Sequence, residues 1–216
     1  LSADSTITGT YTAVNAAIDT SGINNFANAN VTLTGSTTIA EANDMRSNVT
    51  AGTITATITE TYTEDLIDDG ASALTDSAAN AYTVTVAGTT AATDDAAAVT
   101  SVAAANLDLI YATANVDINV TATELTGTIA QITAAFVTNN DNYSYLSDVA
   151  ITPSDATSIS ELNAITALTT GTVSATMDAV TLVNYVDTDG NLTIASGNAL
   201  VIDVSDANSI TAADLN

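Results

Sequence analysis

One succession of residue types recurs along this chain, and residues 149–176 show it most clearly. Val149 and Ile151 alternate with small or polar residues, as in a half-buried strand. Apolar side chains then return at helical spacing, which places them on one face of a helix. Gly171 ends that helix, and a second alternating stretch follows at 172–176. The pattern therefore predicts a strand, a helix and a strand in that order.

The same order recurs from residues 31, 83 and 201, which predicts an internally repeated chain. Complete repeats are expected at 31–82, at 83–148 with a longer first helix, and at 149–200. Residues 201–216 are expected to form the N-terminal part of a further repeat, and residues 1–30 its C-terminal part. The two ends would then be complementary fragments of one structural unit.

A strand followed by a helix, repeated along a chain, implies parallel strands joined by crossover connections. We therefore expect an α/β fold of internally repeated strand-helix units, stacked as a β/α solenoid-like parallel sheet. An all-β sandwich with short helical turns is the alternative, because Thr- and Val-rich runs at regular spacing also occur in sandwiches. Strands are expected at 6–11, 31–35, 53–58, 83–88, 116–120, 149–151, 172–176 and 201–206, and helices at 13–18, 39–45, 63–68, 94–110, 128–137, 159–168 and 177–185.

The split repeat has three interpretations. The half-unit at the end of one molecule can dock on the half-unit at the start of the next, which is an open-ended contact and makes a filament. The ends can instead meet within one molecule and close a ring, or the chain can be an excerpt of a longer repeat protein. We favour head-to-tail assembly, with these interface residues: Val201, Ile202, Val204, Ile210, Leu215, Leu1, Ile7, Tyr11, Val14 and Ile18.

The charge balance is strongly acidic. The chain has 25 acidic residues and one basic residue, Arg46, with no His, which gives a formal net charge of −24. Such a surface repels nucleic acid and anionic lipid, so neither is an expected partner. It attracts divalent cations and suits a saline exterior, where salt screens the self-repulsion. No apolar run approaches the roughly 18 residues that a membrane-spanning helix needs, so membrane insertion is not expected.

Few residues here suit catalysis. Without His, Cys or Lys the usual nucleophile and base pairings are absent. A carboxylate pair could still hydrolyse glycosides, and the available residues are Glu41, Glu60, Glu64, Glu124 and Glu161. Sugar clefts are usually rich in aromatic residues, however, and this chain has only seven Tyr and two Phe. We therefore expect no enzymatic activity.

Calcium is the candidate cofactor. Asp187, Asp189 and Asn191 place three oxygen ligands at alternate positions around Gly190, as loops that bind hard cations do. The loop departs from the EF-hand pattern, because Leu192 occupies the position of the usual glycine. A plain Asp-Gly turn is the alternative interpretation.

Threonine rows suggest another activity. Hydroxyl residues alternate at 6–10, 53–57 and 172–176, so each strand would present them on one face. Stacked in register, these rows would form a flat lattice of hydroxyls like that of ice-binding solenoids. The alternative is that Thr is simply a favoured residue on exposed strands.

Four stretches carry a resemblance: TTGTVSAT at 169–176 with TLVNY at 181–185, LTGTIAQITAAF at 125–136 and ITGTYTAVNAAI at 7–18. They resemble the Thr/Ala/Asp-rich tandem repeats of giant secreted or cell-surface proteins of marine bacteria and cyanobacteria. The resemblance covers most of the chain and implies an extracellular or cell-surface location with an adhesive or matrix role. It carries no catalytic residues.

These observations predict an extracellular structural protein that binds copies of itself head to tail to form a filament, sheath or surface layer. The alternative is a calcium-rigidified segment of a giant cell-surface adhesin, with a glycan as a further candidate partner. An ice-binding solenoid is a minor alternative.

Overall fold

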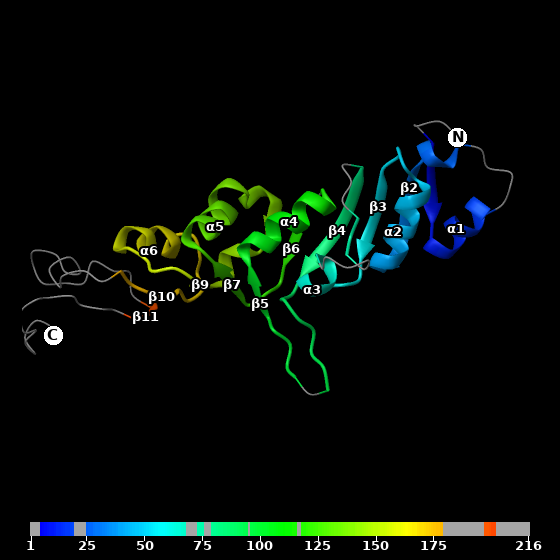
Figure 1. Ribbon diagram of the computed structural model, residues 1–216. Helices are drawn as coiled ribbons and strands as arrows, with labels where there is room; N and C mark the ends of the chain where they lie inside the picture. Colours follow the sequence, from blue (N-terminus) through cyan, green and yellow to red (C-terminus); the bar gives the residue numbers. More distant parts are fainter. Residues whose placement is uncertain are drawn as a thin grey trace, which may run out of the picture.

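The computed structural model describes residues 5–19, 25–67, 73–75, 79–94, 96–115, 118–178 and 197–201. Strands and helices alternate along an elongated body, with the first and last strands at opposite ends (Figure 1). The strands are β1 (Thr6–Gly9), β2 (Asn30–Thr37), β3 (Ile54–Ile58), β4 (Asn80–Val86), β5 (Ser101–Ala103), β6 (Ile118–Val120), β7 (Glu124–Gly127), β8 (Tyr143–Ser144), β9 (Ala150–Pro153), β10 (Ser174–Thr176) and β11 (Ala199–Val201).

The helices are short, and they follow the strands along the chain. The α-helices are α1 (Tyr11–Asp19), α2 (Ile39–Asn48), α3 (Thr63–Leu66), α4 (Ala104–Ala114), α5 (Ile129–Thr133) and α6 (Ile159–Thr166). A π-helical turn, η2 (Ala134–Thr138), continues α5. The 3₁₀ turns are η1 (Phe26–Asn28), η3 (Asn140–Asn142) and η4 (Leu146–Asp148).

All pairs of these strands are parallel. One sheet has six strands in the order β1-β2-β3-β4-β6-β8, a second has the order β5-β7-β9, and β10 pairs with β11. Isolated parallel bridges from Ile151 to Val173 and from Thr157 to Met177 connect β9 and the segment after it to the β10 region. The expected α/β class with parallel strands is confirmed. The all-β sandwich is wrong, because crossover helices rather than hairpins join the paired strands.

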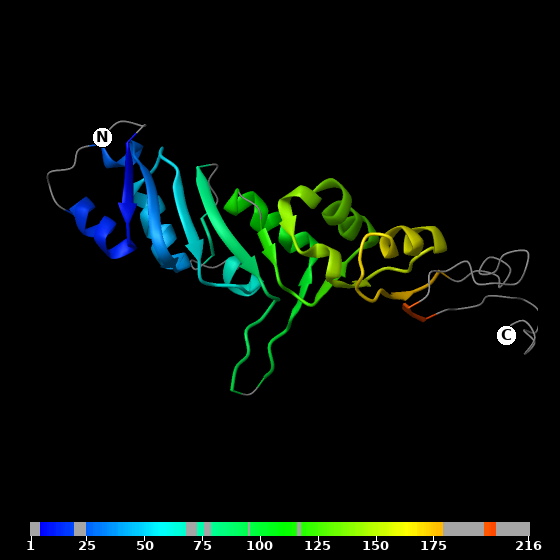
Figure 2. The ribbon, with the colours of Figure 1, turned by 180° about the vertical axis from the view of Figure 1, so that it is seen from behind.

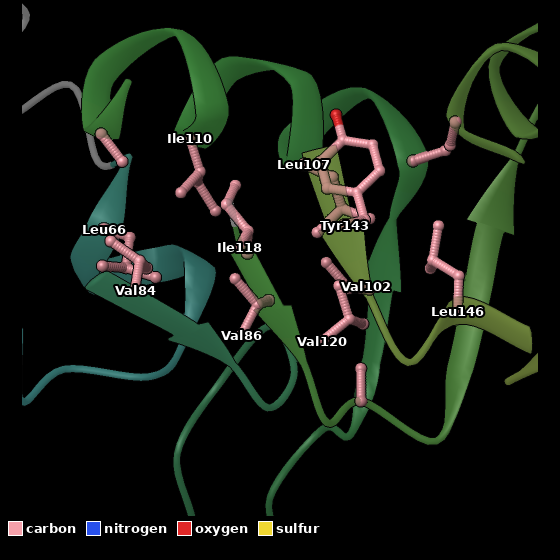
Figure 3. Packing of buried hydrophobic residues seen from close by; sticks show 14 of the residues in the cluster. Leu66, Val84, Val86, Val102, Leu107, Ile110, Ile118, Val120, Tyr143 and Leu146 are labelled. Atoms are coloured by element: carbon pink, nitrogen blue, oxygen red, sulfur yellow. The ribbon is translucent and has the colours of Figure 1, made fainter. Parts of the chain in front are cut away.

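One face of the sheets is buried and the other is open to solvent. In β3, Ile54, Ala56 and Ile58 are buried, whereas Thr55 and Thr57 are exposed. The buried face packs against the helices, which Figures 1 and 2 show gathered on one side of the strands. Figure 3 shows Leu107 and Ile110 of α4 facing the side chains of the strands beneath it. The single core therefore lies between the sheets and the helices.

Three of the described helices begin with a capping box. In α6, Ser158 Oγ accepts from the Glu161 amide at 3.3 Å, and Glu161 Oε2 accepts from the Ser158 amide at 2.9 Å. These bonds satisfy amides that lack acceptors within the helix. The Ser158 hydroxyl, and then its amide, hold the pKa of the Glu161 carboxyl below its ordinary value. The corresponding pairs are Thr38 with Glu41 in α2 and Thr128 with Gln131 in α5.

Glu60 and Asp155 each bond to the N-terminus of a helix in the neighbouring strand-helix unit. Glu60 Oε2 accepts from the Ile39 amide at 3.1 Å, and Asp155 Oδ1 accepts from the Ile129 amide at 2.9 Å. Each amide belongs to the first residue of a helix, where the helix dipole favours negative charge. Each carboxylate comes just after the strand of the following strand-helix unit, so it links one unit to the next.

Residues 94–110, expected as one helix, form more than one element. The helical part is α4, which begins only at Ala104, and Ser101–Ala103 form β5 instead. Alanine-rich sequence favours helix by intrinsic propensity. Parallel pairing of β5 with β7 and complete burial of Val102 outweigh that propensity.

A hairpin-like arm precedes β5. The Thr89 amide donates to the Val99 carbonyl at 2.8 Å, and the Val99 amide donates to the Thr90 carbonyl at 2.9 Å. Figure 1 shows this arm projecting from the sheets between β4 and β5. Neither the arm nor the short strands β7 and β8 were expected from the sequence, because segments this short show no clear alternation.

The remaining expected elements correspond to observed ones with shifted ends. The expected strands before residue 90 match β1 to β4, and the expected helices at 13–18, 39–45, 63–68, 128–137 and 159–168 match α1, α2, α3, α5 with η2, and α6. The expected helix at 177–185 lies outside the described residues except at its start, and so does most of the strand at 201–206.

Two glycines allow successive units to approach closely. A Cβ at Gly52 would lie 1.8 Å from the Ala29 carbonyl oxygen, and one at Gly171 would lie 2.4 Å from the Val149 carbonyl oxygen. Gly52 precedes β3 and Gly171 precedes β10, so both pack on the backbone that precedes the neighbouring strand. Any side chain there must push two units apart.

Gly52→Ala is therefore expected to lower the free energy of unfolding by about 3 kcal/mol or more, because backbone atoms must move. Urea denaturation followed by circular dichroism measures the change. Gly9→Ala is the matched control, because its Cβ would meet only side chains at 3.4 Å or more. Equal stability of the two variants would show that the close approach at Gly52 is unimportant.

Candidate assembly interface

β1 is an open edge of the six-stranded sheet. Within the described residues it pairs with β2 alone. The Asn30 amide donates to the Ser5 carbonyl at 2.8 Å. Backbone groups of successive residues in a parallel strand point to opposite sides. The amides of Thr6 and Thr8 therefore point away from β2, toward a position where another strand can pair.

Side chains at this end are less covered than their neighbours. Ile7 pairs in register with Val31, which pairs with Ile54. Val31 is 1% exposed and Ile54 is fully buried, whereas Ile7 is only half-buried. Tyr11 and Ile18 of α1 are also partly buried against the core. An apolar margin therefore surrounds the open edge.

Val14 differs from the other predicted interface residues of α1. It is 2% exposed and lies inside the core. Its side chain therefore holds α1 on the sheet and does not form part of the accessible surface.

Tyr11 also makes a polar contact with the next unit. Its hydroxyl donates to Asp44 Oδ2 at 2.8 Å, which joins α1 to α2. This hydrogen bond, with burial and the negative charge of Asp44, raises the pKa of Tyr11 above its ordinary value. The phenol is therefore a donor at neutral pH and fixes the position of α1.

The other end of the stack is formed by β11. Within the described residues β11 pairs with β10 alone. Val201 is 65% exposed, whereas Leu200 is partly buried against the core. A shallow groove of about 510 Å³ lies beside these strands, lined by Thr152, Pro153, Ser174, Ala175, Thr176, Ala199, Leu200 and Val201.

Several predicted site residues lie outside the described residues. These are Leu1, Ile202, Val204, Ile210 and Leu215 of the interface, and Asp187, Asp189 and Asn191 of the calcium loop. Among the residues that the structure does describe, no group of three acidic, His or Cys side chains could hold a metal ion. The calcium site stays a prediction.

The glutamates considered for glycoside hydrolysis accept hydrogen bonds within the fold. Glu41 and Glu161 complete capping boxes, and Glu60 accepts from the first amide of α2. Glu64 Oε1 accepts from the Ala91 amide at 3.1 Å, and Glu124 accepts from the Thr152 hydroxyl. The contact that sequence reasoning missed is the one between units, made by Glu60 and Asp155. Its signal is an acidic residue one or two positions after a strand.

Comparison with known proteins found no match. No protein-family model matches the chain, and neither a curated protein nor a solved structure matches it. In the described part of the chain, no helix is both long and apolar enough to span a membrane. What this protein does has to be inferred from its own residues.

Replacing Tyr11 by Phe is expected to destabilise the protein by about 0.5–1 kcal/mol, since the lost hydrogen bond is exposed. A raised pKa in the folded state means that this contribution is complete below the ordinary Tyr pKa, about pH 10, and disappears as pH rises through the folded value. Urea midpoints at pH 8 and pH 11 measure both effects.

Tyr145→Phe is the control, because Tyr145 is 68% exposed. If both variants match the unaltered protein at pH 8, the contact between Tyr11 and Asp44 contributes nothing to stability.

Proposed function

We propose that this protein is an extracellular structural subunit that assembles head to tail into a filament, sheath or surface layer. The observation that carries the proposal is the pair of open strand edges, β1 at one end of the stack and β11 at the other. The partner is a second copy of the chain. A charge of −24 disfavours nucleic acid and anionic membranes as partners.

The strand pairing supports a β/α solenoid as the finer description of the fold. Paired residues on successive strands lie at nearly constant distances along the chain, as in a stack of similar units. The pairs are Thr6 with Asn30, Ile54 with Asn80, Ile118 with Tyr143 and Ser174 with Ala199, separated by 24, 26, 25 and 25 residues. The pair Val84 with Ile118 is separated by 34 residues because the projecting arm lies between them.

The two open edges are complementary because a parallel stack has a direction. A strand inside either sheet offers one edge to the strand before it and the other to the strand after it, whereas in the described part of the chain β5 and β8 end their sheets and pair on one side only. Among the described residues, nothing pairs with the preceding edge of β1 or with the following edge of β11. Pairing of β11 with β1 of another copy would repeat the geometry of the interior. Such a contact is heterologous and open-ended, so it builds filaments.

Apolar burial would add to this strand pairing. An incoming unit would cover Ile7, Tyr11 and Ile18, which are only partly buried at the end of the stack. β1 itself has no charged residue, so few carboxylates would be dehydrated at the contact. Repulsion between whole subunits falls as salt screens their charge, which suits a saline extracellular setting.

The calcium-rigidified adhesin segment is the alternative, with a glycan as its ligand. It requires calcium binding by the loop of Asp187, Asp189 and Asn191, and it requires the protein to stay monomeric. Electron microscopy of the purified chain separates the two proposals, because a polymer shows a regular axial repeat.

Thr8→Pro tests the assembly proposal directly. Proline removes the outward amide of an edge strand, a position that tolerates proline within one subunit. We expect filaments from the unaltered protein and from Thr8→Ala, which keeps the amide, but monomers from Thr8→Pro. Sedimentation velocity in 0.5 M NaCl, a concentration at which charge is screened within about 5 Å, gives the readout.

Circular dichroism must show that Thr8→Pro keeps the native spectrum. Filaments that grow equally well from Thr8→Pro would exclude the edge of β1 as the contact. An unaltered protein that stays monomeric at millimolar concentration would overturn the assembly proposal.

Ice binding is a second candidate function, favoured by the register of the strands. Thr8 pairs with Thr32, and Thr32 with Thr55, so their side chains form a row on the face opposite the helices. Thr57 and Thr83 form part of another row. Strands β1 to β4 contain no charged residue, although the chain is very acidic. This uncharged face with repeated hydroxyls is similar to the flat hydroxyl lattice of ice-binding solenoids.

If this face binds ice, the protein will slow ice recrystallisation, and Thr55→Tyr will abolish most of the effect by disrupting the row. Ser160→Tyr, an exposed change on α6, is the control and should retain it. Absence of any effect from the unaltered protein eliminates ice binding without affecting the assembly proposal.

A further inference from the structure

The only basic side chain of the protein is buried. Arg46 lies in the last turn of α2 and is 6% exposed. Its Nη2 donates to the Gly52 carbonyl at 2.9 Å. A cation near a helix C-terminus interacts favourably with the helix dipole. That contact explains the position of Arg46 in part, but one neutral acceptor does not balance a buried charge.

Arg46 has no anionic partner within the described residues. No ion pair joins it to any of the carboxylates there, and its Nη1 is buried without a hydrogen-bond acceptor. Burial lowers the pKa of Arg46. An unpaired buried charge is costly, because water has been removed and nothing replaces it. In so acidic a protein, this absence requires an explanation.

Tyr82 supplies a second donor near Arg46. It is fully buried on β4, in register with Ala56 of β3. Its hydroxyl, like Nη1 of Arg46, has no partner in the described part of the chain. Burial raises the pKa of Tyr82 to about 12, and the positive charge of Arg46 acts on it in the opposite direction. At neutral pH the hydroxyl is therefore protonated and can donate.

Asn80 lies two residues before Tyr82 on the same buried face of β4. Its Nδ2 donates to the Thr75 and Thr113 carbonyls at 2.8 and 3.2 Å, which fixes the orientation of the amide. Its Oδ1 is buried and has no donor among the described residues. Arg46 Nη1, Tyr82 Oη and Asn80 Oδ1 thus lack partners among the described residues, and the first two are donors.

We propose that Arg46 and Tyr82 form a buried binding site for a small anion of the halide class, such as chloride. The anion would accept hydrogen bonds from Nη1 of Arg46 and from the hydroxyl of Tyr82. It would also balance the guanidinium charge, which a neutral water molecule cannot do. Water is the competing occupant, because it could also donate to Oδ1 of Asn80.

The site would connect two elements of the core. Arg46 is on α2 and Tyr82 is on β4, so a bound anion joins a helix to a strand of a later unit. Binding to the folded state alone stabilises it in proportion to the logarithm of the anion concentration. A saline medium supplies chloride in abundance, and the site would use that supply to stabilise the stack.

Thermal unfolding in sodium chloride and in sodium gluconate at equal ionic strength tests the proposal. Both salts screen the surface charge, but gluconate is too large for the site. We expect a higher Tm in chloride, by about 3–5 °C for each tenfold excess of chloride over its dissociation constant. Arg46→Met should lose this difference between salts. A difference that is unchanged in Arg46→Met would overturn the proposal.

Tyr82→Phe is the second variant, because it removes one donor and keeps the ring should Arg46→Met fail to fold. It should weaken the preference for chloride. Crystals soaked in sodium bromide give the direct readout. Anomalous signal within hydrogen-bonding distance of Arg46 and Tyr82 supports the anion, whereas density without anomalous signal identifies water and refutes it.

Discussion

Parallel backbone pairing between successive strands is the interaction on which this structure depends. Each strand hydrogen-bonds to the next strand-helix unit in its sheet, so the units are held in sequence order along one axis. A helix between paired strands covers one face of the sheet and supplies the apolar side of the core. Close packing then requires glycine where one backbone meets another, as at Gly52 and Gly171. Among the described strands, the same directional pairing leaves β1 and β11 with one partner each.

The acidic composition is accommodated by placing carboxylates where the backbone favours negative charge. Glu60 and Asp155 accept from the first amides of α2 and α5, and each comes from the following unit. Glu161 caps its own helix in the same way. These positions turn charges that repel one another into contacts with helix N-termini. The strands β1 to β4 meanwhile contain no charge, so repulsion does not oppose pairing within the sheet.

The ends of the stack and its interior present the same physical problem, which is a polar or apolar group without a partner. At the end, Ile7 is only half-buried, although its register neighbour Val31 is covered on both sides. In the interior, Arg46 and Tyr82 present donors that no atom of the described residues accepts. A second copy of the chain would cover Ile7, and a small anion would accept hydrogen bonds from Arg46 and Tyr82. The assembly contact and the anion site are therefore both inferred from groups that lack a partner among the described residues.

The sequence alone determined the α/β class and most strands and helices, because periodicity and capping residues are local signals. Tertiary structure decided the rest. Alanine-rich residues 101–103 became strand β5, since pairing with β7 and burial of Val102 outweigh helix propensity. Val14 proved to be core, and Arg46 proved to be buried with no counter-ion in the described part of the chain. Burial and partners are properties of the packed chain, and no local pattern specifies them.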